Sequence, residues 1–511
     1  MALSATREVQ AGICPRMALF PGGMRSLRQL QLRESVMGRP SQHRIGVKCP
    51  SAASLASAPK PLAACLAAIG MVCSASAVAD TFLVTNCNDS GPNSLRSTVA
   101  SATQNLNYDS EIDFDLPASC NSTITLTTGA LPIAQQGILT IRGPDPTQRI
   151  AISGDGKDRV FSTTVRTSQL GLYNLDIKNG EADGSNGAHV AGGCIYSLGS
   201  AKLSYSSVTG CRIESESGYA YGGGIFTANG LTLKSTVVSG NLSDGNYAYG
   251  GGIYATGGLG IYFSTISYNF AFGEGIASGG GISAASGAFI AFSTIDNNTV
   301  GGGSRTIASD AGAAFHGPAR LVSIQSSTVS GNLNELGAGA GLRSSATTTY
   351  VYNSTIAFNT AAQGKDGAGH YVAPGLAVTT GHLVLYNTVL AENSYSGSHH
   401  NDFSTAAGIT VSGSNNMAQA ATGGLPSPGL IFGCPLLGPL RDNGGPTWTH
   451  ALLSKSPAID AGVSTSQLPI GGTFYDQREM PVPSPSGGLP DIGAYEVQQD
   501  DIVFNTSFEG C

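Results

Sequence analysis

The chain has 511 residues, of which 70 are glycine, 41% are hydrophobic and only 12% are charged, a composition that argues against general disorder. Its formal net charge is −7, but residues 1–79 hold nine basic and two acidic residues, so the remainder carries about −14. An acidic surface without a basic run excludes neither small ligands nor proteins, but it disfavours nucleic acid and anionic lipid as partners.

A short apolar run at 61–73 precedes the small residues Ala77-Val78-Ala79. The run is too short to span a membrane, and its position before small residues is typical of a secretory signal peptide. We therefore expect cleavage between Ala79 and Asp80, export to the extracellular space or outer cell surface, and a mature chain without a transmembrane segment. A buried apolar segment is the alternative interpretation.

Six cysteines would remain after this cleavage. Export makes disulfides possible, but six cysteines allow 15 pairings and the sequence does not choose among them. None has the spacing of a zinc site, and no metal or cofactor is expected. They are Cys87, Cys120, Cys194, Cys211, Cys434 and Cys511.

A repeated unit organises the middle of the chain. Gly-Gly-Gly-Ile occurs at 222–225, 250–253 and 279–282, with weaker copies at 339–342 and 367–370. After each unit, a β-rich run ends in a Ser-Thr-apolar pattern that is followed by an asparagine. A period of about 29 residues is typical of a solenoid. The asparagines are Asn241, Asn269, Asn298, Asn332 and Asn359.

Each repeat is too short for a strand-helix-strand unit, and its short alternating runs favour three strands joined by three turns. The fold class is therefore all-β, a parallel β-helix in which equivalent residues of successive coils stack. Stacked asparagines can form a ladder of amide hydrogen bonds. We interpret the five asparagines as this structural ladder and not as catalytic residues.

The repeats resemble the GGA[IL]/FxxN units of polymorphic outer-membrane proteins, which implies a right-handed parallel β-helix, the solenoid fold that also houses pectate lyases. Ser94-Leu95-Arg96 resembles the CSLREAI opening of this group, with Asn93 in place of the cysteine. This segment is expected to form a short helix that closes the N-terminal end, where strand edges would otherwise be open.

Four motifs near the C-terminus resemble the choice-of-anchor Q domain of secreted proteins. They lie at 442–453, 456–462, 476–478 and 491–496. The resemblance implies fold and location but no reaction. The expected layout is a leader at 1–79, a β-helix with an N-terminal cap at 80–430, the choice-of-anchor Q-like domain at 431–498 and a tail at 499–511.

The sequence offers no catalytic site. Glycosidases need paired carboxylates at a cleft, calcium-dependent lyases need clustered acids, and the strands here are nearly free of acids. A few loop residues could converge, but we interpret them as solvated, and we expect neighbouring Asn401 to lie outside the repeats and to tolerate replacement. These loop residues are Asp366, His370, His399, His400 and Asp402.

Two Tyr-Ala-Tyr sequences, Tyr219 to Tyr221 and Tyr247 to Tyr249, precede successive glycine triplets at an offset of one coil. Stacked exposed tyrosine pairs could form an aromatic platform for a glycan or a surface protein, with plain loop packing as the alternative. The function we expect is non-catalytic recognition, as in adhesion or glycan binding, by a monomer. A polysaccharide lyase or glycoside hydrolase is the alternative.

Overall fold

The computed structural model describes residues 79–104, 109–184, 189–302, 314–317, 320–365, 371–395, 399–426, 428–468, 474–483, 488–499 and 501. The apolar run of the expected signal peptide lies outside these residues. Within them, no helix has the length and apolar character needed to cross a membrane.

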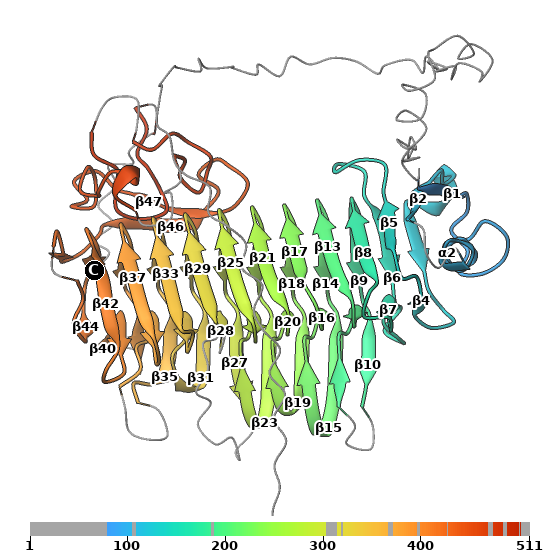
Figure 1. Cartoon of the computed structure of the whole chain (residues 1–511), viewed down its shortest axis with the longest axis horizontal. Coiled ribbons are helices and arrows are strands. Elements are labelled where there is room, and N and C mark those ends of the chain that lie inside the picture. The colour runs from blue at the N-terminus through green and yellow to red at the C-terminus, as the bar shows by residue number, and fades with distance from the viewer. Residues whose placement is uncertain are drawn as a thin grey trace, which may run out of the picture. The chain divides into compact units, whose positions relative to one another are not determined.

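The described chain is a parallel β-solenoid (Figure 1). Each coil contributes one strand to each of three long sheets, and successive coils pair in parallel. Sheet 1 comprises β1 (Asp80–Val84), β2 (Ser110–Phe114), β5 (Ile138–Arg142), β8 (Gln169–Tyr173), β13 (Ser200–Ser204), β17 (Leu231–Lys234), β21 (Gly258–Tyr262), β25 (Gly287–Ala291), β29 (Leu321–Gln325), β33 (Thr348–Tyr352), β37 (His382–Tyr386) and β42 (Thr410–Ser414).

Sheet 2 follows sheet 1 within each coil, and the middle residue of most of its strands is a buried Val, Ile or Leu of the core. It comprises β3 (Thr123–Thr125), β6 (Ile150–Ser153), β9 (Leu175–Lys178), β14 (Ser207–Thr209), β18 (Val237–Ser239), β22 (Thr265–Ser267), β26 (Thr294–Asp296), β30 (Thr328–Ser330), β34 (Thr355–Ala357), β38 (Val389–Ala391), β43 (Met417–Ala418) and β45 (Ile431–Phe432).

Sheet 3 closes each coil, and in the central repeats its strands β16, β20 and β24 begin directly after the Gly-Gly-Gly runs. It comprises β4 (Leu131–Ile133), β7 (Phe161–Thr163), β12 (Ile195–Ser197), β16 (Ile225–Thr227), β20 (Ile253–Ala255), β24 (Ile282–Ala284), β28 (Phe315–Gly317), β32 (Leu342–Ser344), β36 (Leu376–Val378), β41 (Phe403–Thr405) and β44 (Ala421–Thr422).

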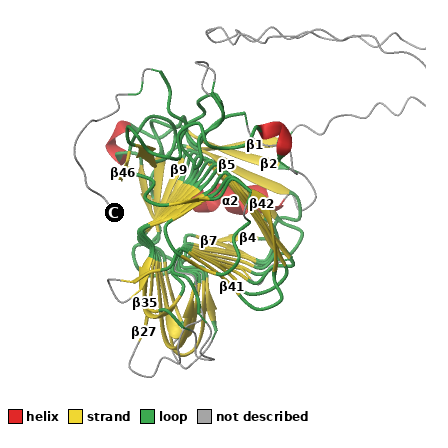
Figure 2. Cartoon of the chain, turned by 90° about the vertical axis from the view of Figure 1, so that its left-hand side faces the viewer, coloured by secondary structure: helices red, strands yellow, loops and turns green. Residues whose placement is uncertain are grey.

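A fourth sheet, which we call the fin, is inserted between sheets 2 and 3 in addition to the three strands expected per coil (Figure 2). Its longer strands pair in two halves separated by a register shift, as in β15 and β19. Small buried residues such as Ala248, Ala271 and Ala277 form its own core. The fin comprises β10 (Glu181–Asp183), β11 (Val190–Ala191), β15 (Arg212–Tyr221), β19 (Leu242–Tyr249), β23 (Phe270–Ser278), β27 (Thr299–Gly302), β31 (Leu333–Ala338), β35 (Thr360–Gln363), β39 (Ser394–Tyr395) and β40 (His399–His400).

The five predicted asparagines lie in one buried column at the corner between sheet 2 and the fin. Each side-chain Nδ2 donates to Oδ1 of the asparagine one coil later, at 2.8–3.0 Å, and each backbone N–H donates to the same oxygen. The column begins where Cys211 N–H donates to Asn241 Oδ1, and it continues from Asn359 to Asn393, which the sequence analysis did not include. The asparagines therefore hold successive coils in register.

The asparagine ladder ends on a carboxylate. Asp402 Oδ1 accepts hydrogen bonds from the backbone N–H and Nδ2 of Asn393, and Oδ2 accepts from the N–H groups of Gln419 and Ala420. Burial raises the pKa of Asp402 to about 6 against the lowering effect of these bonds. The interpretation of Asp402 as a solvated loop residue is wrong, because its side chain is fully buried. Asn401 is also buried, and its amide bonds to Thr422.

The N-terminal end carries the expected short helix, α2 (Leu95–Gln104), whose Leu95, Val99 and Ala102 join the solenoid core. A short 3₁₀ turn, η2 (Ala118–Cys120), follows. Disulfides join Cys87 to Cys120 and Cys194 to Cys211, and Cys434 is also disulfide-bonded. The first bond lies in the N-terminal cap. The second includes Cys211, whose backbone N–H begins the asparagine ladder.

The C-terminal segment lies on the outer face of sheet 2. It contains the antiparallel pair β46 (Leu437–Arg441) and β47 (Thr449–Leu452) and a 3₁₀ turn, η3 (Thr465–Gln467). Gln477 donates to Thr294 Oγ1 at 2.9 Å and accepts from Thr328 Oγ1 at 2.7 Å. Because these threonines are neighbours in adjacent coils, one side chain anchors the segment to two coils.

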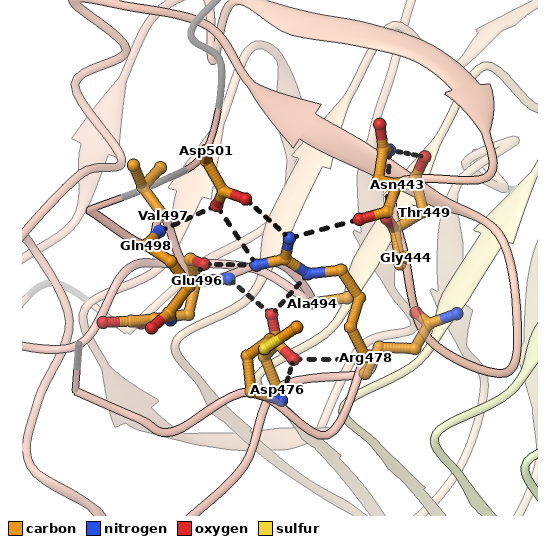
Figure 3. Close-up of polar contacts among 12 residues, drawn as sticks. Asn443, Gly444, Thr449, Asp476, Arg478, Ala494, Glu496, Val497, Gln498 and Asp501 are labelled. Carbon is orange, nitrogen blue, oxygen red and sulfur yellow. Dashed lines mark hydrogen bonds and ion pairs between the residues drawn. The ribbon is translucent and has the colours of Figure 1, made fainter. Parts of the chain in front are cut away.

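An ion-pair network holds this segment together (Figure 3). Arg478 pairs with Asp476 at 2.9 Å and with Asp501 at 3.1 Å, and its guanidinium lies 3.7 Å from the ring centroid of Tyr495. Arg478 and Asp476 are each 3% exposed. The motifs at 476–478 and 491–496 therefore supply internal packing and docking contacts.

Candidate functional site

The four predicted tyrosines lie on the outer face of the fin. In β15, Tyr219 and Tyr221 flank buried Ala220, so both side chains point outward. In β19, Tyr247 and Tyr249 take the same positions one coil later and pair in register with them. The offset in the sequence thus corresponds to stacking in space.

The tyrosine rings stack along the solenoid. The Tyr219 and Tyr247 centroids are 4.5 Å apart with planes 17° from parallel, and those of Tyr221 and Tyr249 are 5.7 Å apart at 18°. His189 contacts Tyr219 edge-on at 4.8 Å. Offset stacking at such distances is favourable for aromatic pairs.

A second aromatic column, which the sequence analysis missed, lies beside the first on sheet 3. Tyr196, Phe226 and Tyr254 are in register, with centroids 5.3 and 5.9 Å apart. Each follows an isoleucine of the repeat, so the repeat period itself contained the signal.

The two columns meet where the fin adjoins sheet 3. Tyr221 of the fin and Tyr254 of sheet 3 both point outward, yet their centroids lie only 4.7 Å apart. We call this surface the aromatic corner; it comprises Tyr196, Tyr219, Tyr221, Phe226, Tyr247, Tyr249 and Tyr254.

Stacking determines what the aromatic corner presents. Neighbouring rings cover part of one another's faces, and all seven residues are half-buried, so each keeps some surface that a ligand can reach. Burial raises the pKa of Tyr221 to about 12 and also raises the pKa values of Tyr249 and Tyr254. These hydroxyls are therefore protonated donors and acceptors at neutral pH.

The outer column of sheet 3 contains no carboxylate among the described residues. Paired acids of the kind that glycosidases use are thus missing from this column. No group of three or more His, Cys, Asp or Glu within the described ranges is arranged to hold a metal ion. In register, the column runs Pro132, Ser162, Tyr196, Phe226, Tyr254, Ser283, His316, Arg343, Ala377, Ser404 and Thr422.

Of the five loop residues considered for catalysis, the structure describes the side chains of His400 and Asp402. Asp366 and His370 lie outside the described residues, and so does the side chain of His399. His400 is exposed at the edge of the fin, whereas Asp402 is buried in the ladder.

No family model matches the chain, and no curated protein matches it. Among solved structures, it is similar to pectate lyase Pel9A, with 14% identity, a TM-score of 0.41, and coverage of 82% of this chain and 98% of that one. Such a likeness does not extend to activity. The β-solenoid itself is shown by the strand pairing of this chain.

Proposed function

We propose that the aromatic corner is a recognition surface and that the protein binds a glycan there without transforming it. The observation that carries this proposal is the convergence of two stacked columns of half-buried aromatic residues, whose Tyr221 and Tyr254 rings lie 4.7 Å apart where the columns meet. Tyrosine combines an apolar body with a polar tip, which suits a ligand that has hydroxyl groups on apolar rings.

A neutral glycan fits this surface better than an acidic one. Beyond residue 79 the chain carries about −14 formal charges. An anionic polymer would be repelled over a Debye length of about 8 Å at physiological salt. The acid-free outer column of sheet 3 also favours binding over a lyase or hydrolase activity, the alternative function.

The sharpest test removes hydroxyls and keeps the rings. The double change Tyr221→Phe and Tyr249→Phe should weaken binding to a neutral glycan by roughly tenfold, because each lost hydrogen bond is worth about 0.5–1.5 kcal/mol. The glycan would be found by array screening, and its affinity measured by calorimetry. Because the stacked rings remain, far-UV circular dichroism and the melting temperature should not change.

Tyr350→Phe is the matched control, because Tyr350 is also half-buried but lies on sheet 1, away from the aromatic corner. It should leave affinity unchanged. Equal affinities for the double variant and the wild type would contradict the proposal. Turnover of a polysaccharide by the wild-type protein would instead support the enzyme alternative.

We also propose that the protein is exported, in keeping with the resemblances to polymorphic outer-membrane and choice-of-anchor Q proteins. The sequence before Asp80 supports this through its apolar run and small residues. N-terminal sequencing of the exported form should give Asp80 as the first residue. An exported chain that retains the leader would contradict the cleavage site.

A further inference from the structure

A pocket lies toward the C-terminal end of sheet 3. The outer column that carries Tyr196, Phe226 and Tyr254 in earlier coils continues there with Ala377 and Ser404. Small side chains in place of rings leave the surface hollowed, and the resulting pocket has a volume of about 670 Å³. This volume is within the usual range for small-molecule sites, roughly 300–1,000 Å³.

The pocket walls combine apolar and polar groups. Val372, Ala377 and Val378 supply apolar surface, and Ser404 and Thr405 add hydroxyls. Tyr371 also lines the pocket and is 53% exposed, so part of its ring is accessible to a ligand. A mostly apolar wall with a few polar groups is typical of sites that take a ring-bearing molecule.

Arg343 is the one charged side chain among the described residues that line the pocket. It is 8% exposed and stands in register with His316 of the preceding coil. Burial, with a smaller contribution from Arg343, lowers the pKa of His316 to about 4, so this histidine is neutral near pH 7. Lys365 Nζ lies 4.5 Å from the ring centroid of Tyr371, so two cationic side chains lie near the pocket. Of these, the Arg343 guanidinium has a fork of donors that matches a carboxylate.

We propose that this pocket binds a small molecule that carries a carboxylate on an apolar ring. The carboxylate accepts hydrogen bonds from Arg343, and the ring packs against Val372, Ala377 and Tyr371. The site is separate from the aromatic corner and does not depend on the glycan proposal.

The test compares two probes of the same shape. Phenylacetate carries the required carboxylate, and phenylacetamide replaces it with a neutral amide. Saturation-transfer NMR and calorimetry on the whole chain should show phenylacetate binding at least about tenfold more tightly, the difference expected for a charge-assisted hydrogen bond. Equal binding of the two probes, or no binding of phenylacetate, would overturn the proposal.

Two variants locate the binding site. Ala406 lines the pocket but is exposed, so Ala406→Phe should fill the pocket without disturbing the core and should abolish phenylacetate binding. Ala406→Ser, which adds little volume, is its control and should bind as the wild type does. Arg343→Lys keeps the charge but loses the fork, and should weaken binding at least severalfold. Unchanged affinity in Ala406→Phe would place the probe elsewhere and refute the assignment.

Discussion

Replacement of Gly251 by alanine is expected to destabilise the protein by about 3 kcal/mol or more. A Cβ atom on Gly251 would lie 2.3 Å from the carbonyl oxygen of Gly280 and 2.5 Å from the carbonyl carbon of Phe270. Both contacts are with backbone of the next coil, which cannot rotate away as a side chain could. The coils would have to separate at the corner between the fin and sheet 3. Chemical denaturation monitored by circular dichroism measures the loss.

Gly258→Ala is the matched control for this effect. Gly258 begins β21, only seven residues later, and a Cβ atom there would meet nothing within 4 Å. Its backbone is not in the left-handed region, so alanine should be neutral or slightly stabilising. If both variants had the same denaturation midpoint, close packing would not be the reason for the glycine triplet.

Asn298→Leu should cost roughly 3 kcal/mol or more in the free energy of unfolding. Its Nδ2 donates to Ile266 O and to Asn332 Oδ1, and its Oδ1 accepts two hydrogen bonds from Asn269. Leucine removes all four hydrogen bonds and leaves their buried partners unsatisfied. Each unsatisfied group costs about 1–3 kcal/mol before the surroundings relax.

The control must be an exposed asparagine. Asn88→Leu meets this requirement, since Asn88 is exposed and lies outside the ladder, and it should change stability by less than about 0.5 kcal/mol. Asn401, which the sequence analysis expected to tolerate replacement, is unsuitable because it is 2% exposed and bonds to Thr422. Comparable losses in the two variants would argue against a special role for the ladder.

The repeat spacing predicted the solenoid because stacking of equivalent residues follows directly from a fixed period. Asn241 and Asn269, for example, are 28 residues apart in the sequence and one coil apart in space. The repeat spacing did not predict that Asp402 belongs to the ladder, because Asp402 follows Asn393 by only nine residues. There the chain turns back through the antiparallel pair β39 and β40, so it reaches the ladder without completing a coil.

Contacts that join distant segments could not be read from local patterns. Gln477 stood out only as part of a C-terminal motif, because its partners Thr328 and Thr294 lie 149 and 183 residues earlier. Similarly, the Tyr221–Tyr254 contact depends on the angle between the fin and sheet 3. A period places residues within a column, but it does not show how two columns meet.

The asparagine ladder has a direction, and that direction limits how such a chain can gain or lose coils. Within the ladder, every Nδ2 from Asn241 to Asn359 donates to Oδ1 of the asparagine in the following coil. If an internal coil were duplicated or deleted, the Nδ2 donor of one asparagine would therefore still meet the Oδ1 acceptor of another at the new junction. A coil added beyond Asp402 would instead start from a carboxylate that has no hydrogen to donate. By internal duplication, this solenoid can lengthen while Asp402 remains the last residue of the ladder.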